Sequence, residues 1–124
     1  MEYVATESAP KAIGPYSQAV KANGVLYTSG QISLDPSTME LAEGDFEAQA
    51  RRVFENLAAV LTEAGSDFQR VLKATVYVTD LANFQTLNTV YAEYFGTHKP
   101  ARTTVQVSAL PKGSLVEIDL VALL

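Results

Sequence analysis

The sequence contains no cysteine, no tryptophan and only one histidine, His98. The lack of cysteine excludes a disulfide framework, cysteine-based zinc and iron–sulfur sites, and a thiol nucleophile. A metal centre would have to be built from carboxylates and His98 alone, so we expect no metal. No nucleophile–base–orienter set for covalent catalysis is visible either.

Basic residues are also few. Nine Lys and Arg stand against 14 Asp and Glu, which gives a net charge of −5 and a pI near 4.7. Proteins that bind nucleic acid usually carry a basic patch or stripe, and here the basic residues are scattered, so we expect no nucleic-acid partner. The N-terminus lacks the pattern of a signal peptide, and no apolar run has the length of a membrane span. We therefore expect a cytoplasmic protein without a membrane partner.

The 124 residues predict one domain, residues 1–124. Asn23-Gly24 lies between extended segments 17–20 and 25–29 and predicts a hairpin, because both central residues of a type I′ turn need positive φ. Apolar residues recur every three or four positions in segment 45–64, which predicts a helix with Asp45 as N-cap and Gly65 as its stop.

The second half of the chain predicts a strand, a helix and two strands. Segment 70–79 alternates, with its apolar face formed by Leu72, Ala74, Val76 and Val78. Asp80 is predicted to cap a helix that ends at Gly96, with the inward residues Leu81, Phe84, Leu87, Tyr91, Tyr94 and Phe95. Strands are predicted over 102–107 and 115–124.

The predicted order is ββαβαββ, an α+β fold. The strand–helix–strand step favours a parallel pair and the hairpins favour antiparallel ones, so the sheet is mixed and two helices cover one face of it. The other face would carry side chains of both kinds: Tyr77, Glu117, Asp119 and Val121. A bare face of this size is unusual for a monomer, so we predict a homo-oligomer that buries it.

Two charged residues lie where binding or catalysis is conceivable. Arg102 follows Pro100-Ala101 and opens a strand; its guanidinium suits a carboxylate, but a surface ion pair gives the same pattern. Glu117 lies inside an apolar strand and is either at an exposed edge or in a polar site. From the residue pattern alone, both interpretations stay open.

Four separated segments resemble the signature segments of the reactive intermediate deaminase (Rid, YjgF) family, most closely its RidA branch. They occur in order over essentially the whole chain, and the resemblance includes Asn88: Ala12-Ile13-Gly14-Pro15-Tyr16-Ser17-Gln18-Ala19-Val20, Tyr27-Thr28-Ser29-Gly30-Gln31-Ile32, Pro100-Ala101-Arg102-Thr103-Thr104-Val105 and Val116-Glu117-Ile118.

The resemblance implies a chorismate-mutase-like homotrimer with active sites between subunits. It implies a deaminase that needs no cofactor or metal and hydrolyses 2-imino (2-enamine) acids from PLP-dependent dehydratases to 2-keto acids and ammonia. By position, Arg102 would clamp the substrate carboxylate, and Glu117 would orient or activate water or move a proton at the imine nitrogen. The remaining site residues would be Tyr16, Ser29, Gly30, Asn88 and Thr104.

Two positions depart from the family pattern. Thr104 stands where many RidA-type members have cysteine; the backbone carbonyl carries most of the role there, so we expect activity without thiol-dependent regulation. Lys99 replaces a frequent aromatic residue, which could change the preferred substrate. Three alternatives to the imine deaminase stay open: a non-catalytic regulatory trimer that binds 2-keto acids, a deaminase of another substrate such as 2-aminomuconate, and an RNA-directed role, which the acidic balance disfavours.

Overall fold

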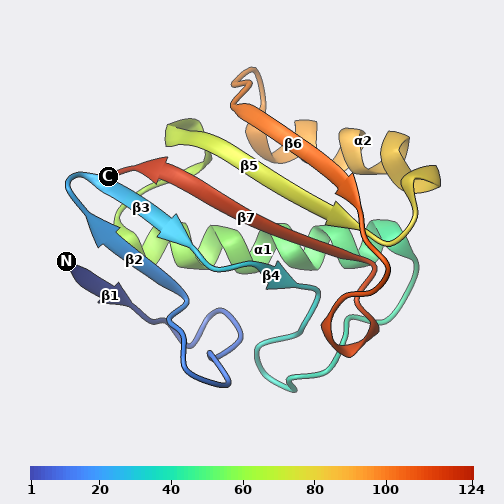
Figure 1. Cartoon of the computed structure of the whole chain (residues 1–124), viewed down its shortest axis with the longest axis horizontal. Helices are drawn as coiled ribbons and strands as arrows, with labels where there is room; N and C mark the ends of the chain where they lie inside the picture. The colour runs from blue at the N-terminus through green and yellow to red at the C-terminus, as the bar shows by residue number, and fades with distance from the viewer.

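The computed structural model describes the whole chain, Met1–Leu124. A seven-stranded sheet forms one layer, and the helices α1 (Phe46–Ala64) and α2 (Phe84–Phe95) both lie on one side of it (Figure 1). The strand order is β1-β2-β3-β7-β5-β6, and β4 also pairs with β7. The strands are β1 (Glu2–Val4), β2 (Ala19–Ala22), β3 (Val25–Thr28), β4 (Gln31–Ile32), β5 (Val71–Val78), β6 (Ala101–Gln106) and β7 (Val116–Leu123).

The predicted α+β architecture is confirmed. β5 and β6 are parallel and connected through α2, whereas all other strand pairs are antiparallel. The hairpin between β2 and β3 turns at Asn23 (φ 53°) and Gly24 (φ 77°), as the type I′ signal predicted. The prediction missed β1 and β4, which are too short to show a clear alternation.

The helix predicted over 45–64 is confirmed as α1. The Asp45 carboxylate accepts the backbone N–H of Ala48 at 3.1 Å, and Gly65 ends the helix with φ 84°. The apolar stripe packs against the sheet, and its centre, which includes Val53, Phe54 and Leu57, is fully buried. Neither helix combines the length and the apolar character needed to cross a membrane.

The predicted core face of β5 is wrong at one residue. Val71 is buried instead of Leu72, whose exposed fraction is 45%. The register explains the change, since Val71 pairs with Ala122 and Lys73 with Val121, so that Leu72 is an extra residue in a β-bulge. After the bulge the alternation is as predicted: Ala74, Val76 and Val78 are buried.

The start of the second helix also differs from the prediction. The Asp80 carboxylate caps a short 3₁₀ turn, Leu81–Asn83, by accepting the N–H of Ala82 at 2.9 Å, and α2 begins only at Phe84. Leu81 and Phe84 were predicted to be buried but are 44% and 39% exposed. The core residues of α2 include Leu87 and Phe95. Gly96 ends the helix, as predicted.

Candidate active site

Arg102 lies between β6 and α2. Its strand partner is the buried Ala74, so its side chain lies on the face of the sheet that carries the helices. The guanidinium donates from Nη1 to Oδ1 of Asn88 at 2.8 Å. Its central carbon lies 4.8 Å from the ring centre of Tyr91 and 5.5 Å from that of Phe84. One hydrogen bond and two aromatic rings therefore fix this cation.

Arg102 has no carboxylate partner in the chain. The three salt bridges are formed by Lys21 with Glu2 and by Arg51 with Glu47 and Glu93. A guanidinium has five N–H donors in a planar fork, and Asn88 uses only one of them. The remaining donors can hold a carboxylate through two parallel hydrogen bonds.

Glu117 lies on the opposite face of the sheet. It belongs to β7 and pairs with Tyr77 of β5 and Ile32 of β4. Burial raises the pKa of the Glu117 carboxyl, and the negative charge of Asp119 on the same face raises it further. No hydrogen bond or cation lowers it. A carboxylate in such a position favours a cationic neighbour and binds a proton more tightly than an ordinary glutamate does.

Asp119 lies two residues along β7 from Glu117 but has partners. The Tyr77 hydroxyl donates to its carboxylate at 3.2 Å. Burial raises the pKa of Asp119, and the Tyr77 hydrogen bond and the nearby Lys73 oppose that rise. Of the two carboxylates, Glu117 is therefore the one left free to act on a ligand.

Gly30 precedes β4 and lies directly beneath Glu117. A Cβ added at Gly30 would lie only 2.8 Å from the carboxyl carbon of Glu117 and would overlap its Oε2. Any side chain at this position would displace the carboxylate. The requirement for glycine at position 30 is thus explained by the close approach of Glu117.

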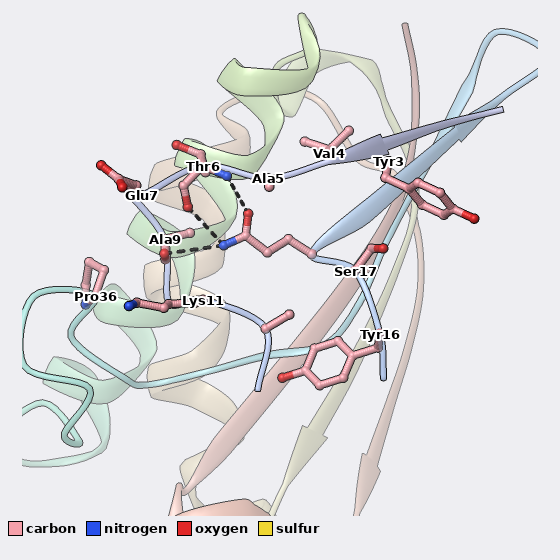
Figure 2. A pocket seen from close by; sticks show the side chains of 12 residues that line it. Tyr3, Val4, Ala5, Thr6, Glu7, Ala9, Lys11, Tyr16, Ser17 and Pro36 are labelled. Atoms are coloured by element: carbon pink, nitrogen blue, oxygen red, sulfur yellow. Dashed lines mark hydrogen bonds between the residues drawn. The ribbon is translucent and has the colours of Figure 1, made fainter. Parts of the chain in front are cut away.

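Tyr16 lies on an ordered loop beside this region. The amide of Gln18, which is buried, accepts the N–H of Thr6 at 2.7 Å and donates to the carbonyls of Thr6, Ala9 and Pro10. These bonds connect the N-terminal segment to the start of β2 around a hollow of about 650 Å³ that Tyr16 and Lys11 line (Figure 2). The Ser29 hydroxyl donates to the carbonyl of Ser17 at 2.6 Å, which fixes the loop at its other end.

A smaller hollow of about 310 Å³ brings Tyr16 and Gly30 together. Its wall is completed by residues of the N-terminal loop, β4 and the turn before β7, among them Ile13, Ile32 and Lys112. Tyr16 is 54% exposed, so its ring is accessible from outside the chain. This hollow has the size of a small-molecule site.

A buried polar network fixes β4 and the start of β7 against α1. The Ser33 hydroxyl donates to Oε1 of Gln49 at 2.9 Å and lies 3.0 Å from the hydroxyl of Ser114. The same Gln49 oxygen accepts the N–H of Leu115 at 2.9 Å. Because these groups are buried and satisfied, the backbone that carries Gly30 and Glu117 is held rigidly.

The seven site residues suggested by the resemblance thus form two groups. The first group, which we call the carboxylate half-site, comprises Tyr16, Ser29, Gly30 and Glu117. The second, the guanidinium half-site, comprises Asn88, Arg102 and Thr104. The two half-sites lie on opposite faces of the sheet, since Arg102 and Thr104 pair with the buried Ala74 and Val76, and Glu117 pairs with the outward Tyr77. One small ligand cannot contact both charges in a single chain.

Sequence reasoning missed the roles of three aromatic or amide side chains. Phe84 and Tyr91 were predicted to be core residues of the second helix, and their contacts with Arg102 depend on how α2 packs beside β6. Gln18 belongs to a signature segment, but nothing in its spacing revealed the hydrogen bonds that order the loop. The spacing of Phe84, Asn88 and Tyr91, which places them on one helix face, was the available signal.

His98 and the acidic residues form no centre of their own. Nε2 of His98 lies 2.7 Å from the carbonyl oxygen of Val71, so this ring is used in connecting the end of α2 to β5. No three histidine, aspartate or glutamate side chains gather closely enough to hold a metal ion.

Comparison with known proteins identifies the family. The family model described as Endoribonuclease L-PSP matches residues 6–124. The chain belongs to this family, which is the Rid (YjgF) family. Among its relatives, the human protein named 2-iminobutanoate/2-iminopropanoate deaminase is 46% identical to this Rid chain over 120 residues, which are 97% of this chain and 88% of the human one.

Two further relatives cover nearly all of this Rid chain. Protein DfrA of Myxococcus xanthus is 57% identical over 119 residues, which are 94% of this chain and 91% of DfrA. The crystal structure of RidA from the Antarctic bacterium Psychrobacter sp. PAMC 21119 superposes with a TM-score of 0.96 at 46% identity and full coverage of both chains. The resemblance inferred from the four sequence segments is therefore confirmed.

Proposed function

We propose that this Rid protein is a deaminase that hydrolyses 2-imino acids, and their 2-enamine tautomers, to 2-keto acids and ammonia. The observation that carries the proposal is the pair of charges without counterions, a fixed guanidinium at Arg102 and a partly buried carboxylate at Glu117. A 2-iminium acid carries a carboxylate and, one carbon away, a cationic C=N group. The two unpaired charges complement the two ends of this substrate.

Arg102 would bind the substrate carboxylate through the donors that Asn88 leaves free. The Tyr16 ring and the Gly30 backbone would line the cleft beside the imine carbon. Thr104 stands where many relatives have cysteine. Its hydroxyl is buried without a hydrogen-bond partner, so the Thr104 side chain itself makes no polar contact within the chain.

Glu117 would carry the proton in the hydrolysis. Water held by the carboxylate attacks the iminium carbon; the new C–O bond forms as one water proton passes to Glu117. The protonated Glu117 then returns that proton to the amino nitrogen of the tetrahedral intermediate. As the C–N bond breaks, the hydroxyl proton passes to the Glu117 carboxylate and the keto group forms, and the released ammonia takes up that proton and leaves as ammonium. The raised pKa of Glu117 suits both directions of transfer.

A second copy of the chain would complete the site. Across β1, β2, β3 and β7 the face away from the helices carries an apolar row: Tyr3, Val20, Tyr27 and Val121. Tyr27 is 51% exposed and Tyr3 is 73% exposed. We propose the homotrimer expected from the resemblance, in which a neighbour covers this face and brings its guanidinium half-site to the carboxylate half-site.

The deaminase is preferred over two other functions, and a third shares its chemistry. A regulatory trimer that only binds 2-keto acids would use Arg102 but would have no use for the unpaired Glu117. An RNA-directed role, which the endoribonuclease description of the family would suggest, fits poorly with the net charge of −5 and with a single histidine whose Nε2 contacts a backbone carbonyl. Another imino substrate, such as one derived from 2-aminomuconate, would use the same two charges.

The test generates 2-iminobutanoate from threonine with a PLP-dependent dehydratase in the presence of semicarbazide, which traps the imine. We expect the protein to lower semicarbazone formation and to accelerate release of 2-oxobutanoate. Arg102→Ala should remove the acceleration and leave the oligomer intact in light scattering. No acceleration over spontaneous hydrolysis for any of a panel of amino-acid-derived imines would refute the deaminase. Calorimetric binding of 2-oxobutanoate without turnover would favour the regulatory trimer.

A further inference from the structure

Three residues on one face of α2 contact the side chain of Arg102. Phe84, Asn88 and Tyr91 follow one another at steps of four and three residues, so they line one side of the helix. All three contact the Arg102 guanidinium, through an amide hydrogen bond of 2.8 Å and ring distances of 5.5 Å and 4.8 Å. The helix therefore presents a cage to this cation, in addition to the apolar face that it packs into the core.

Core packing accounts for only part of this arrangement. Leu87 and Val90 fill the buried face of α2, whereas Phe84 is 39% exposed and lies outside the hydrophobic core. Tyr91 contacts both the hydrophobic core and Arg102. Its ring packs against Phe95 at 4.3 Å and Phe54 at 5.9 Å, and its other neighbour is Arg102. The aromatic core thus holds the Tyr91 ring in place, and the ring in turn supports the guanidinium.

The hydroxyl of Tyr91 has no part in this contact. Its oxygen is buried and has no hydrogen-bond partner. A buried hydroxyl without a partner contributes nothing favourable, so the ring explains what this residue does for Arg102. Ring faces attract cations, and guanidinium groups stack on them in a defined orientation.

We propose that Phe84, Asn88 and Tyr91 are positioning residues that orient Arg102 before substrate arrives, so that α2 sets the affinity of the enzyme for the substrate carboxylate. The inference rests on the proposed function, in which Arg102 binds that carboxylate. An arginine free to rotate must be ordered on binding, whereas one already held by a cage loses less freedom. The cage acts before the reaction, so its loss should raise KM and leave kcat nearly unchanged.

The experiment compares Tyr91→Leu, Tyr91→Phe and Phe84→Leu in the imine-hydrolysis assay, with calorimetric binding of 2-oxobutanoate as a second measurement. Tyr91→Leu should raise KM by about tenfold, within the range of a desolvated cation–π contact, and change kcat by less than about twofold. Tyr91→Phe keeps the ring and should behave like wild type. Phe84→Leu should raise KM by about threefold with an unchanged Tm, which keeps the test valid if Tyr91→Leu fails to fold.

Leu81→Ala is the matched control, because Leu81 is a similarly exposed apolar residue just before α2 and is not one of the hydrogen-bond or ring partners of Arg102. A wild-type KM in both Leu variants would overturn the inference, as would a loss in Tyr91→Phe equal to that in Tyr91→Leu. If wild type binds 2-oxobutanoate but hydrolyses no imine, the deaminase fails and weaker binding by the Leu variants still supports the cage. If wild type neither binds nor hydrolyses, both ideas are refuted.

Discussion

Arg102 and Glu117 are both partly buried and both lack a counterion within the chain, yet their surroundings are opposite in kind. Arg102 is held by an amide oxygen at 2.8 Å and by two aromatic rings. Glu117 has no hydrogen bond and lies close against the backbone of Gly30, where a Cβ would displace it. Buried hydrogen bonds hold the backbone beside Glu117, but its carboxylate has no hydrogen-bond partner of its own.

This difference fits two functions, substrate binding and proton transfer. A group that only binds gains from being fixed in advance, because little freedom is then lost on binding. A group that carries a proton from water to nitrogen must serve two positions in turn, and it needs a pKa close to the working pH. The fixed guanidinium and the free carboxylate with a raised pKa therefore fit binding and proton transfer, respectively.

The largest effect is expected from changing the fixed charge. Arg102→Lys keeps a positive charge but loses the fork, and Arg102→Ala loses both. Hydrogen bonds to charged groups contribute about 1.5–3 kcal/mol each, so Arg102→Ala, which loses two, should lower kcat/KM by at least about 100-fold, and Arg102→Lys, which can keep one, by at least about tenfold. Arg51→Lys is the control, because Arg51 forms surface ion pairs with Glu47 and Glu93 and is not one of the groups that hold Arg102. A lysine variant within about threefold of wild type would show that charge alone suffices and that the cage is unnecessary.

Removing the free carboxylate should lower kcat rather than raise KM. Glu117→Gln keeps the shape and abolishes proton transfer, for which the expected loss is about 100-fold in kcat. Asp119→Asn is the matched control: Asp119 lies on the same face of β7, and burial raises its pKa too, but Tyr77 already bonds it. Equal losses of kcat in the two variants would mean that the negative charge on this face of β7 matters, and not the position of Glu117.

A smaller effect is expected from moving Glu117 without removing it. Gly30→Ala would displace the flexible end of the Glu117 side chain. Gly30 is not among the glycines with positive φ, so alanine causes no backbone strain. We expect kcat to fall by roughly tenfold, as for a misplacement of about 1 Å or less, with little change in Tm. An unchanged kcat would mean that the position of Glu117 in the free chain is not the working one.

The sequence predicted the elements of this fold better than their contacts. Local signals in the sequence predict the hairpin at Asn23-Gly24, the capped helix α1 and the parallel step across α2, because these signals do not depend on distant contacts. The exposure of Leu72 depends on a β-bulge, which local alternation cannot reveal. Likewise Phe84 looked like a core residue, because the apolar pattern does not distinguish a ring packed on the core from one packed on a cation.

The site was suggested by the resemblance, and its arrangement in space could not be foreseen. Spacing alone left open whether Arg102 and Glu117 are surface charges or residues of a site. That the two lie on opposite faces follows from strand pairing between β5, β6 and β7, which joins residues far apart in the chain. The position of Glu117 above Gly30 requires the pairing of β4 with β7, and β4 itself is too short for the sequence to predict.

The smallest expected effect is on stability, and it has a definite sign. Burial raises the pKa of Glu117 and Asp119 in the folded chain, so folded protein binds protons more tightly than unfolded protein. The free energy of unfolding therefore falls as pH rises from the ordinary carboxyl range through the raised pKa values, and it is level above them.

Glu117→Gln removes the contribution of Glu117 to this decrease in the free energy of unfolding. The variant should therefore be more stable than wild type at neutral pH, with a Tm higher by about 1–4 °C. The advantage should disappear at acid pH, where wild-type Glu117 is protonated in both states. Asp119→Asn should gain less, because Tyr77 and Lys73 already compensate that carboxylate. Thermal melts from pH 4 to pH 8 measure both differences. A Glu117→Gln protein less stable than wild type at neutral pH would mean that Glu117 has a favourable partner in the assembled protein, and the contrast with the fixed Arg102 would then be lost.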